Sequence, residues 1–186
     1  MKLMTLVFGL TAALTVAAVP SPFVGHDVGP PDNHNGQFIQ VILNTHNVHR
    51  RKNCAPDLVW DDGQAQQALQ ALLKCPKDFS HDRPGQNFIA SGPGWIHDWD
   101  SWIKATIDSV EAWYSEEPKY NYNNPGFSVA TGHFTQVVWK GSLRVGCSWA
   151  VCKDSNYPAR FVCNYDPYGN IVNGGFFAAN VDRPRC

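Results

Sequence analysis

The first half of the chain shows apolar residues at the spacing of amphipathic helices. In QFIQVILNTHNVHRR, which begins at Gln37, apolar residues recur every three or four positions and share one helix face. A second helix is predicted after Asp61 and Asp62, which are suitable N-cap residues, and Pro76 ends it. A third helix is predicted over residues 101–116, again with one apolar face.

The pattern changes after Gly126. The segments FTQVVW, RVGCSWAV and ARFVCNYD are short, rich in β-branched and aromatic residues, and separated by Gly, Ser, Asn and Pro. They are predicted to be antiparallel strands at residues 134–139, 144–151 and 159–166. Because helices come first and strands later, the pattern favours an α+β domain over alternating βαβ units.

The N-terminal part differs from the rest in composition. The uncharged run after Lys2 is shorter than the roughly 20 apolar residues that cross a bilayer, and it ends in small residues. Residues 1–18 are therefore predicted to be a cleaved secretory signal. Residues 19–36, rich in Pro and Gly, are predicted to be a flexible leader, and residues 37–186 one folded domain. We expect a secreted, extracellular protein with no stable membrane insertion.

Secretion changes how the cysteines are interpreted. All six lie beyond the predicted signal, and an even number of cysteines in an oxidising compartment predicts three disulfides. Six cysteines can pair in many ways, and the residues alone do not choose among them. The 15 basic and 16 acidic residues nearly balance, so the charge does not indicate a nucleic acid partner.

Two histidines have neighbours that suit a functional site. His81 follows the second predicted helix, and His133 opens the stretch GHFTQ. His46 and His49 lie three residues apart on the first helix, a spacing that suits a metal less well than four. Taken alone, each histidine is more often a hydrogen-bonded structural residue than a ligand, because a metal site needs partners in space.

Three tryptophans are concentrated in one short segment. Trp95, Trp99 and Trp102 follow a turn of Gly, Pro and Gly. They either cap the core or line an apolar surface for a ligand, and both interpretations remain open on the residues alone. The ligand interpretation rests on the fact that small-molecule sites are usually lined by aromatic side chains.

Several motifs together resemble those of the CAP superfamily, which includes cysteine-rich secretory proteins, antigen 5 and pathogenesis-related 1 proteins. GHFTQVVW with VGC, and FVCNYDPYGN, are similar to its two signature stretches. THNVHR, LVWDDGQAQQA and EAWYSEEPKY are similar to motifs further upstream, and all follow the family order from about Gln37 to Asn170. The signal and leader resemble those of fungal pathogenesis-related 1-like members. The resemblance implies an α-β-α sandwich with a central antiparallel sheet and a large cleft.

The resemblance also implies which residues line that cleft. The family cleft carries two histidines and two acidic residues, which correspond here to His81, His133 and Glu116, with Gln86 in place of the second acid. Gln86 cannot take up a proton at neutral pH, so we expect no catalytic residue in this tetrad. A divalent cation, with zinc favoured, is expected at the two histidines. Glu116 is then either a third ligand or an acceptor that holds an imidazole. The cation is not expected to be required.

Disulfide pairing is implied in the same way. The resemblance implies Cys147 with Cys163 and Cys75 with Cys152, and, with these assigned, Cys54 with Cys186.

The resemblance implies a lipid as ligand. Fungal and plant members bind sterols, in yeast relatives through an aromatic-rich loop near this segment, and some members bind fatty acids. We therefore expect a protein that binds a sterol or a fatty acid at Trp95, Trp99 and Trp102, for export, detoxification or contact with a host. It is expected not to be an enzyme.

Two other functions remain open from the sequence. One is a metal-dependent hydrolase or protease that uses His81, His133 and Glu116. The other is a secreted ligand or inhibitor that engages a host or microbial protein.

Overall fold

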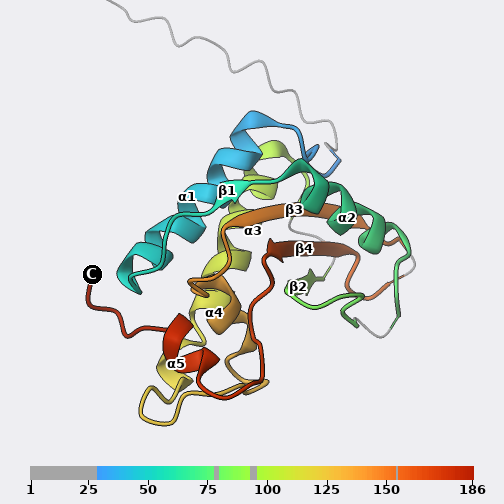
Figure 1. The fold of residues 1–186 in the computed structure, drawn as a ribbon. Helices are drawn as coiled ribbons and strands as arrows, with labels where there is room; N and C mark the ends of the chain where they lie inside the picture. The colour runs from blue at the N-terminus through green and yellow to red at the C-terminus, as the bar shows by residue number, and fades with distance from the viewer. Residues whose placement is uncertain (1–28, 78–79, 93–95, 154) are drawn as a thin grey trace, which may run out of the picture.

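The computed structural model of the chain describes residues 29–77, 80–92, 96–153 and 155–186. Helices surround a four-stranded sheet (Figure 1). Along the chain the elements are α1 (Gly36–Lys52), β1 (Val59–Trp60), α2 (Asp62–Leu73), β2 (Gln86–Ser91), α3 (Trp99–Tyr114), the 3-10 turn η1 (Glu117–Lys119), α4 (Gly132–Val137), β3 (Arg144–Val151), β4 (Ala159–Asp166) and α5 (Phe176–Asn180). Among the described residues, no helix is both long and apolar enough to cross a membrane.

The three predicted helices are confirmed, and side-chain caps explain where they begin. The side chain of Asn35 accepts hydrogen bonds from two backbone N–H groups in the first turn of α1. Asp61 caps α2 in the same way, as predicted. The third helix begins at Trp99 and not at residue 101, because Asp98 and Ser101 form a capping box.

The folded domain begins before the predicted boundary at Gln37. Asn33 is buried, and its side-chain amide donates to the Ser148 hydroxyl at 3.4 Å. The Ser148 hydroxyl in turn donates to the Ala65 carbonyl. The end of the predicted leader is therefore part of the packed domain, since this polar contact links it to β3 and α2.

The sheet has the strand order β1-β3-β4-β2. β3 and β4 pair antiparallel and coincide with the strands predicted at residues 144–151 and 159–166. β2 pairs antiparallel with β4, whereas the two-residue β1 pairs parallel with β3. The sheet is therefore mixed, and the expected antiparallel arrangement holds for three of its four strands.

The prediction of a strand at residues 134–139 is wrong, because this segment forms α4 and the turn that follows it. Phe134, Val137, Val138 and Trp139 are all at most 2% exposed. In α4 the polar residues Thr135 and Gln136 are buried beside Phe134 and Val137, so polarity does not follow exposure and the six-residue helix shows no helical period. Short apolar runs of this kind do not distinguish a strand from a buried helix.

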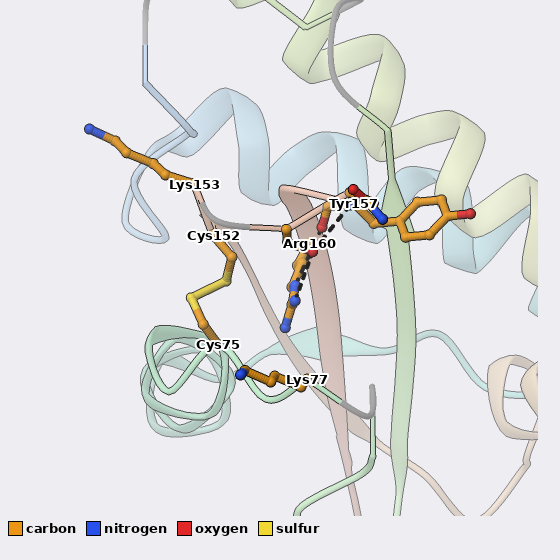
Figure 2. Close-up of a pocket in the computed structure, with 8 residues that line it drawn as sticks. Cys75, Lys77, Cys152, Lys153, Tyr157 and Arg160 are labelled. Carbon is orange, nitrogen blue, oxygen red and sulfur yellow. Dashed lines mark hydrogen bonds between the residues drawn. A yellow bond between two sulfur atoms is a disulfide. The ribbon is translucent and has the colours of Figure 1, made fainter.

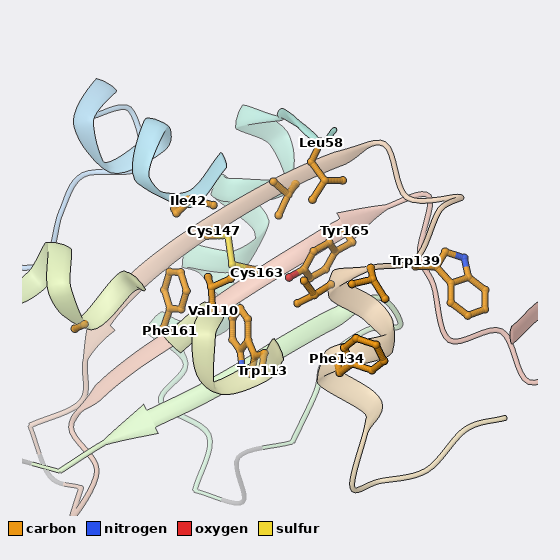
Figure 3. Close-up of a cluster of buried hydrophobic side chains, with 14 of the residues drawn as sticks. Ile42, Leu58, Val110, Trp113, Phe134, Trp139, Cys147, Phe161, Cys163 and Tyr165 are labelled. Atoms are coloured by element: carbon orange, nitrogen blue, oxygen red, sulfur yellow. A yellow bond between two sulfur atoms is a disulfide. The ribbon is translucent and has the colours of Figure 1, made fainter. Parts of the chain in front are cut away.

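The layers form the expected α-β-α sandwich. On one face of the sheet, α2 packs through Ala68 and Leu72 against Val162 of β4. On the other face, α1 and α3 pack over Phe161, the neighbour of Val162 in the strand. Adjacent residues of a strand point to opposite faces, so β4 serves both layers. Figure 3 shows the larger cluster, in which Trp113 of α3 stacks on Phe161 with ring centroids 5.5 Å apart.

A buried arginine holds the segment after α4. Arg50 of α1 is fully buried and donates to the carbonyl oxygens of Pro56, Val137, Trp139 and Ser142 at 2.7–2.9 Å. Burial lowers the pKa of its guanidinium to about 10, so the group is still charged at neutral pH. The four carbonyl dipoles compensate the loss of water around this charge.

The three disulfides pair as the resemblance implied. Cys147 and Cys163 face each other across β3 and β4, in the buried core. Cys75 and Cys152 join the end of α2 to the end of β3, and Cys54 and Cys186 attach the C-terminus behind α1. Cross-links of this kind favour the folded chain chiefly by restricting the unfolded one.

Candidate functional site

Glu116 lies just after the end of α3, immediately before η1, and its side chain contacts the start of α4. Its carboxylate oxygen Oε2 accepts hydrogen bonds from the backbone N–H groups of His133 and Phe134 at 3.0 and 3.1 Å. These N–H groups belong to the first turn of α4, whose own N-cap residue, Thr131, makes no side-chain cap bond. A carboxylate from outside α4 therefore caps this helix, at the end where the helix dipole favours a negative charge.

The same carboxylate orients the imidazole of His133. Oε1 of Glu116 lies 2.8 Å from Nδ1 of His133, so Nδ1–H donates to Glu116 in the neutral ring. Nε2 is then the ring nitrogen with the free lone pair. Trp113 of α3 stacks beside the ring, with centroids 6.1 Å apart and planes inclined by 21°. The side chains of Glu116 and Trp113 thus hold His133 in one orientation while a third of it stays exposed.

His81 and Gln86 lie beside this pair. His81 is exposed at the surface, and partial desolvation lowers the pKa of its imidazole; a hydrogen bond with Gln86 opposes this shift and the nearby His133 adds to it. Gln86 opens β2 and is 9% exposed. Its amide nitrogen donates to Asp82 at 3.0 Å and to Asn164 at 2.9 Å. The four residues predicted from sequence therefore lie close together, and the buried Gln86 links the segment that carries His81 to β4 through hydrogen bonds to Asp82 and Asn164.

Glycine is required at the turn that leads into Gln86. Gly85 has φ of +69°, a left-handed conformation that side chains rarely adopt. A Cβ atom at this position would lie 2.4 Å from Cβ of Tyr168. The turn can therefore place His81 and Gln86 beside α4 only because residue 85 has no side chain.

A buried chain of hydrogen bonds behind the site was not predicted from sequence. The imidazole of His46 donates from Nδ1 to the Ile42 carbonyl at 2.8 Å, and its Nε2 lies 2.7 Å from the Tyr165 hydroxyl. The Asn87 amide donates to the His133 carbonyl at 3.0 Å and approaches the Tyr165 oxygen at 3.4 Å. This chain links α1, β4 and β2 to α4. The polar residues that open β2 were the available signal, since buried polar groups need partners.

The donor set limits what cation chemistry this site supports. Glu116 already accepts three hydrogen bonds, so it has the second of its two predicted roles, as the acceptor behind His133. Within the described part of the chain, no group of three His, Cys, Asp or Glu side chains is arranged to hold a metal ion. Two imidazoles with water at the other positions fit a weak cation site, whereas a catalytic zinc usually has three protein ligands.

The tryptophan segment divides into different environments. Trp95 lies outside the described residues. Trp99, half-buried at the start of α3, donates from Nε1 to the Gln37 side chain at 2.9 Å and so bridges the N-terminal ends of α3 and α1. Trp102 is 3% exposed and packs edge-on against Trp149 at 5.3 Å. Its assignment to a ligand surface is therefore wrong: one helical turn beyond the N-terminus, α3 faces the core.

A separate cavity of about 470 Å³ lies beside the Cys75–Cys152 disulfide (Figure 2). Lys77, Lys153 and Arg160 contribute to its lining together with polar side chains. Arg160 is 2% exposed and donates to the Pro76 carbonyl at 2.6 Å. The cavity lies near the Ser91 end of β2, away from the Gln86 end that carries the histidines.

Residues 43–165 match the cysteine-rich secretory protein family, CAP. The chain belongs to the CAP family. It is 34% identical to human Golgi-associated plant pathogenesis-related protein 1 over 157 residues, which are 80% of this chain and 95% of the relative. It is 49% identical to Protein PRY2 of Saccharomyces cerevisiae over 149 residues, which are 77% of this chain and 41% of that protein. Secreted protein RBT4 of Candida albicans is 32% identical over 163 residues, 80% of this chain and 42% of the relative.

Solved structures show the same fold. The structure of BmVAL-1 has a TM-score of 0.65 at 20% identity and covers 85% of this chain and 89% of its own. That of NaASP2 with Zn²⁺ has a TM-score of 0.64 at 22% identity, covering 84% and 92%. At this level of identity the likeness shows the CAP sandwich alone, and the zinc belongs to NaASP2.

The relatives also bear on the compartment. Two Candida albicans relatives are named as secreted proteins, and three disulfides are typical of an oxidising compartment. Both observations indicate an extracellular CAP protein of the fungal pathogenesis-related 1 type. The chain spans only 41–42% of the length of PRY2 and RBT4, so the activities of those whole proteins do not transfer directly. The predicted signal at residues 1–18 lies outside the described residues.

Proposed function

We propose that this CAP protein binds a small hydrophobic ligand, a sterol in the first place and a fatty acid in the second, and that it does so without catalysis. The observation that carries this proposal is the position of Trp99. Its indole is anchored through Nε1 to Gln37, and the ring is half-buried where the N-terminal ends of α1 and α3 meet. An aromatic ring held in this way offers apolar area to a ligand at little cost in side-chain entropy.

The surroundings of Trp99 support a ligand at this place. Ile96, just before α3, packs against the main core cluster while part of it stays accessible. The N-cap of α3 uses the Asp98 side chain, which leaves Asp100 and His97 exposed beside the segment. A sterol is rigid and almost wholly apolar, with one hydroxyl group. An apolar surface with a few polar groups at its edge matches that chemistry.

The histidine site supports a secondary role for a cation. His81 and His133 would hold it, with Glu116 orienting His133, and the ion would supply positive charge that links the segment before β2 to α4. The Gln86 amide neither gains nor loses a proton near neutral pH, and its donors are taken by Asp82 and Asn164. Acid–base catalysis at this site would therefore lack its second partner.

The test is sterol binding by the secreted protein, measured with labelled ergosterol and cholesterol, with and without EDTA. We expect saturable binding that falls by at least roughly tenfold in Trp99→Ala, since one aromatic side chain contributes about 1.5–3 kcal/mol of apolar burial and about 1.4 kcal/mol is a factor of ten. Trp95→Ala tests the neighbouring residue. Weaker binding in EDTA that His81→Gln reproduces would couple the cation to the ligand site.

Trp60→Ala is the matched control. Trp60 is also half-buried and also uses its Nε1, which donates to Asp62 at 2.9 Å, but it lies on β1. An equal loss in Trp60→Ala would place the ligand elsewhere than at Trp99. If neither sterol nor fatty acid bound in any condition, the proposal would be overturned in favour of a protein partner.

A further inference from the structure

Two uncharged segments meet at the N-terminus of α4. Residues 120–132 and residues 167–181 contain no Asp, Glu, Lys, Arg or His. Asn170 joins them, because its amide nitrogen donates to the Gly132 carbonyl at 2.8 Å and its oxygen accepts from the Thr135 hydroxyl at 2.6 Å. Figure 1 shows both segments at the end of the molecule that carries α4 and α5. We refer to the two segments together as the uncharged surface.

Large apolar side chains are exposed on this surface. Val129 is 87% exposed and Val172 72%, the two highest values for large apolar side chains among the described residues. Three aromatic side chains accompany them with exposures of 44–51%: Phe127, Tyr168 and Phe176. The Phe127 ring lies 3.2 Å from the Cβ position of Gly132, so its loop folds back onto α4. Exposed apolar side chains on two segments that are joined in this way mark a surface that contacts another phase or molecule.

The charges at its edges indicate the kind of partner. Glu117 and Lys119 precede the first segment. Asp166 precedes the second segment, and Asp182 and Arg183 follow it, so charges of both signs flank the surface. Arg183 donates to Asn123 at 2.8 Å and lies over the Tyr122 ring, which draws this cation against the surface. An edge with charges of both signs around a neutral centre gives little net attraction to a strongly anionic or cationic partner. It is complementary to a partner that is itself neutral overall.

A lipid interface fits these features. Aromatic residues favour the level of the headgroups, and exposed apolar side chains gain free energy when they leave water at that depth. The backbone N–H and C=O groups of these loops need hydrogen-bond partners, and water is still available at the level of the headgroups. The loops therefore do not enter the hydrocarbon core.

We propose that the uncharged surface docks on the interfacial region of a zwitterionic lipid bilayer, with Phe127, Val129 and Val172 inserted among the headgroups. The docking is independent of the ligand site at Trp99. Trp99 begins α3 and the first uncharged segment follows its far end, which is about 23 Å away along the helix at 1.5 Å per residue. The two proposals therefore stand or fall separately.

The test is flotation of the secreted protein with sterol-free phosphatidylcholine vesicles. We expect the protein to float with the vesicles, and the double variant Val129→Asp/Val172→Asp to lose at least about tenfold in partition coefficient, because two exposed apolar side chains are replaced by charges. The matched control is Val48→Asp/Val151→Asp, which charges two valines of 49% and 43% exposure on α1 and β3. Near-UV circular dichroism checks that both variants are folded.

Several results would overturn the proposal. The protein could fail to float, or both double variants could lose binding equally. Flotation that needs phosphatidylserine and disappears in high salt would assign the membrane contact to charged residues elsewhere. Light scattering that shows a dimer which dissociates in Val129→Asp/Val172→Asp, without flotation of the parent, would assign the surface to a second copy of the chain. Sterol binding in solution is measured separately, so its failure would not be confused with any of these.

Discussion

The buried imidazole of His46 should make the stability of this protein sensitive to mild acid. His46 is fully buried, and desolvation lowers the pKa of its imidazole from 6.5 to about 3. Its two nitrogens already serve neutral partners, the Ile42 carbonyl and the Tyr165 hydroxyl. A proton on this ring would place an unpaired charge next to Arg50, which also opposes protonation. The native state therefore keeps His46 neutral.

The sign and size of the effect follow from this shift. Below pH 6.5 the unfolded chain binds a proton at this histidine and the native state does not, so the free energy of unfolding falls as the pH falls. The contribution is complete above pH 6.5 and is lost progressively toward pH 3. One pKa unit corresponds to about 1.4 kcal/mol, so His46 alone removes about 2 kcal/mol between pH 7 and pH 5.

The assay is urea unfolding with the disulfides intact at pH 7, 6 and 5, on the parent and on His46→Gln. The variant is less stable at pH 7, but its free energy of unfolding should fall by about 2 kcal/mol less on going to pH 5. Histidines 49 and 81 also have lowered pKa values, and their contribution is common to both proteins. Tyr165→Phe is the matched control, because it removes the hydroxyl partner but keeps the titrating ring. It should be less stable by about 1 kcal/mol and keep the parent's dependence on pH. Equal dependence in the parent and His46→Gln would refute the reasoning.

Two further predictions concern the histidine site. Glu116→Gln should lower the free energy of unfolding by about 1–2 kcal/mol, because α4 loses its charged cap; a chemical denaturation curve that matches the parent would contradict this role. Gly85→Ala should lower stability by at least about 1–3 kcal/mol, because the new Cβ meets Tyr168 at a strained φ. Gly126→Ala, where a Cβ meets nothing within 4 Å, is its control, and equal melting temperatures for the two variants would count against the argument.

Local signals in the sequence were sufficient for the outer helices and the two central strands. Asp61 caps α2 as predicted because an N-cap acts on the next few backbone N–H groups, which are neighbours in the chain. The strands at residues 144–151 and 159–166 are dense in β-branched and aromatic residues and end at turns. The CAP motifs predicted that His81, Gln86, Glu116 and His133 line one site. In the structure His81 lies beside Gln86 and His133, and Glu116 contacts His133.

The failures have a common physical cause. α4 was predicted as a strand because its short run of buried residues, polar and apolar alike, shows no helical period. Its cap comes from Glu116, which is 17 residues away from His133 in the chain. Trp102 was assigned to a ligand surface, although Trp149 of β3 covers it. β2 was not predicted because it begins with two buried polar residues, Gln86 and Asn87. Their hydrogen-bond partners, Asn164 and Tyr165, lie far along the chain.

The sequence by itself determined the family, the outer helices, the two central strands and, through the family resemblance, the disulfide pairing. These features depend on short-range capping, on periodicity, or on motifs that can be read in order. Only the tertiary structure decided that Glu116 supports His133 and caps α4, and that His46, Tyr165 and Asn87 form one buried chain behind the site. It also decided that two uncharged segments share one surface. These features depend on contacts between side chains that are far apart in the chain. Such contacts form only when the layers pack, because packing determines which groups are buried and which can form hydrogen bonds.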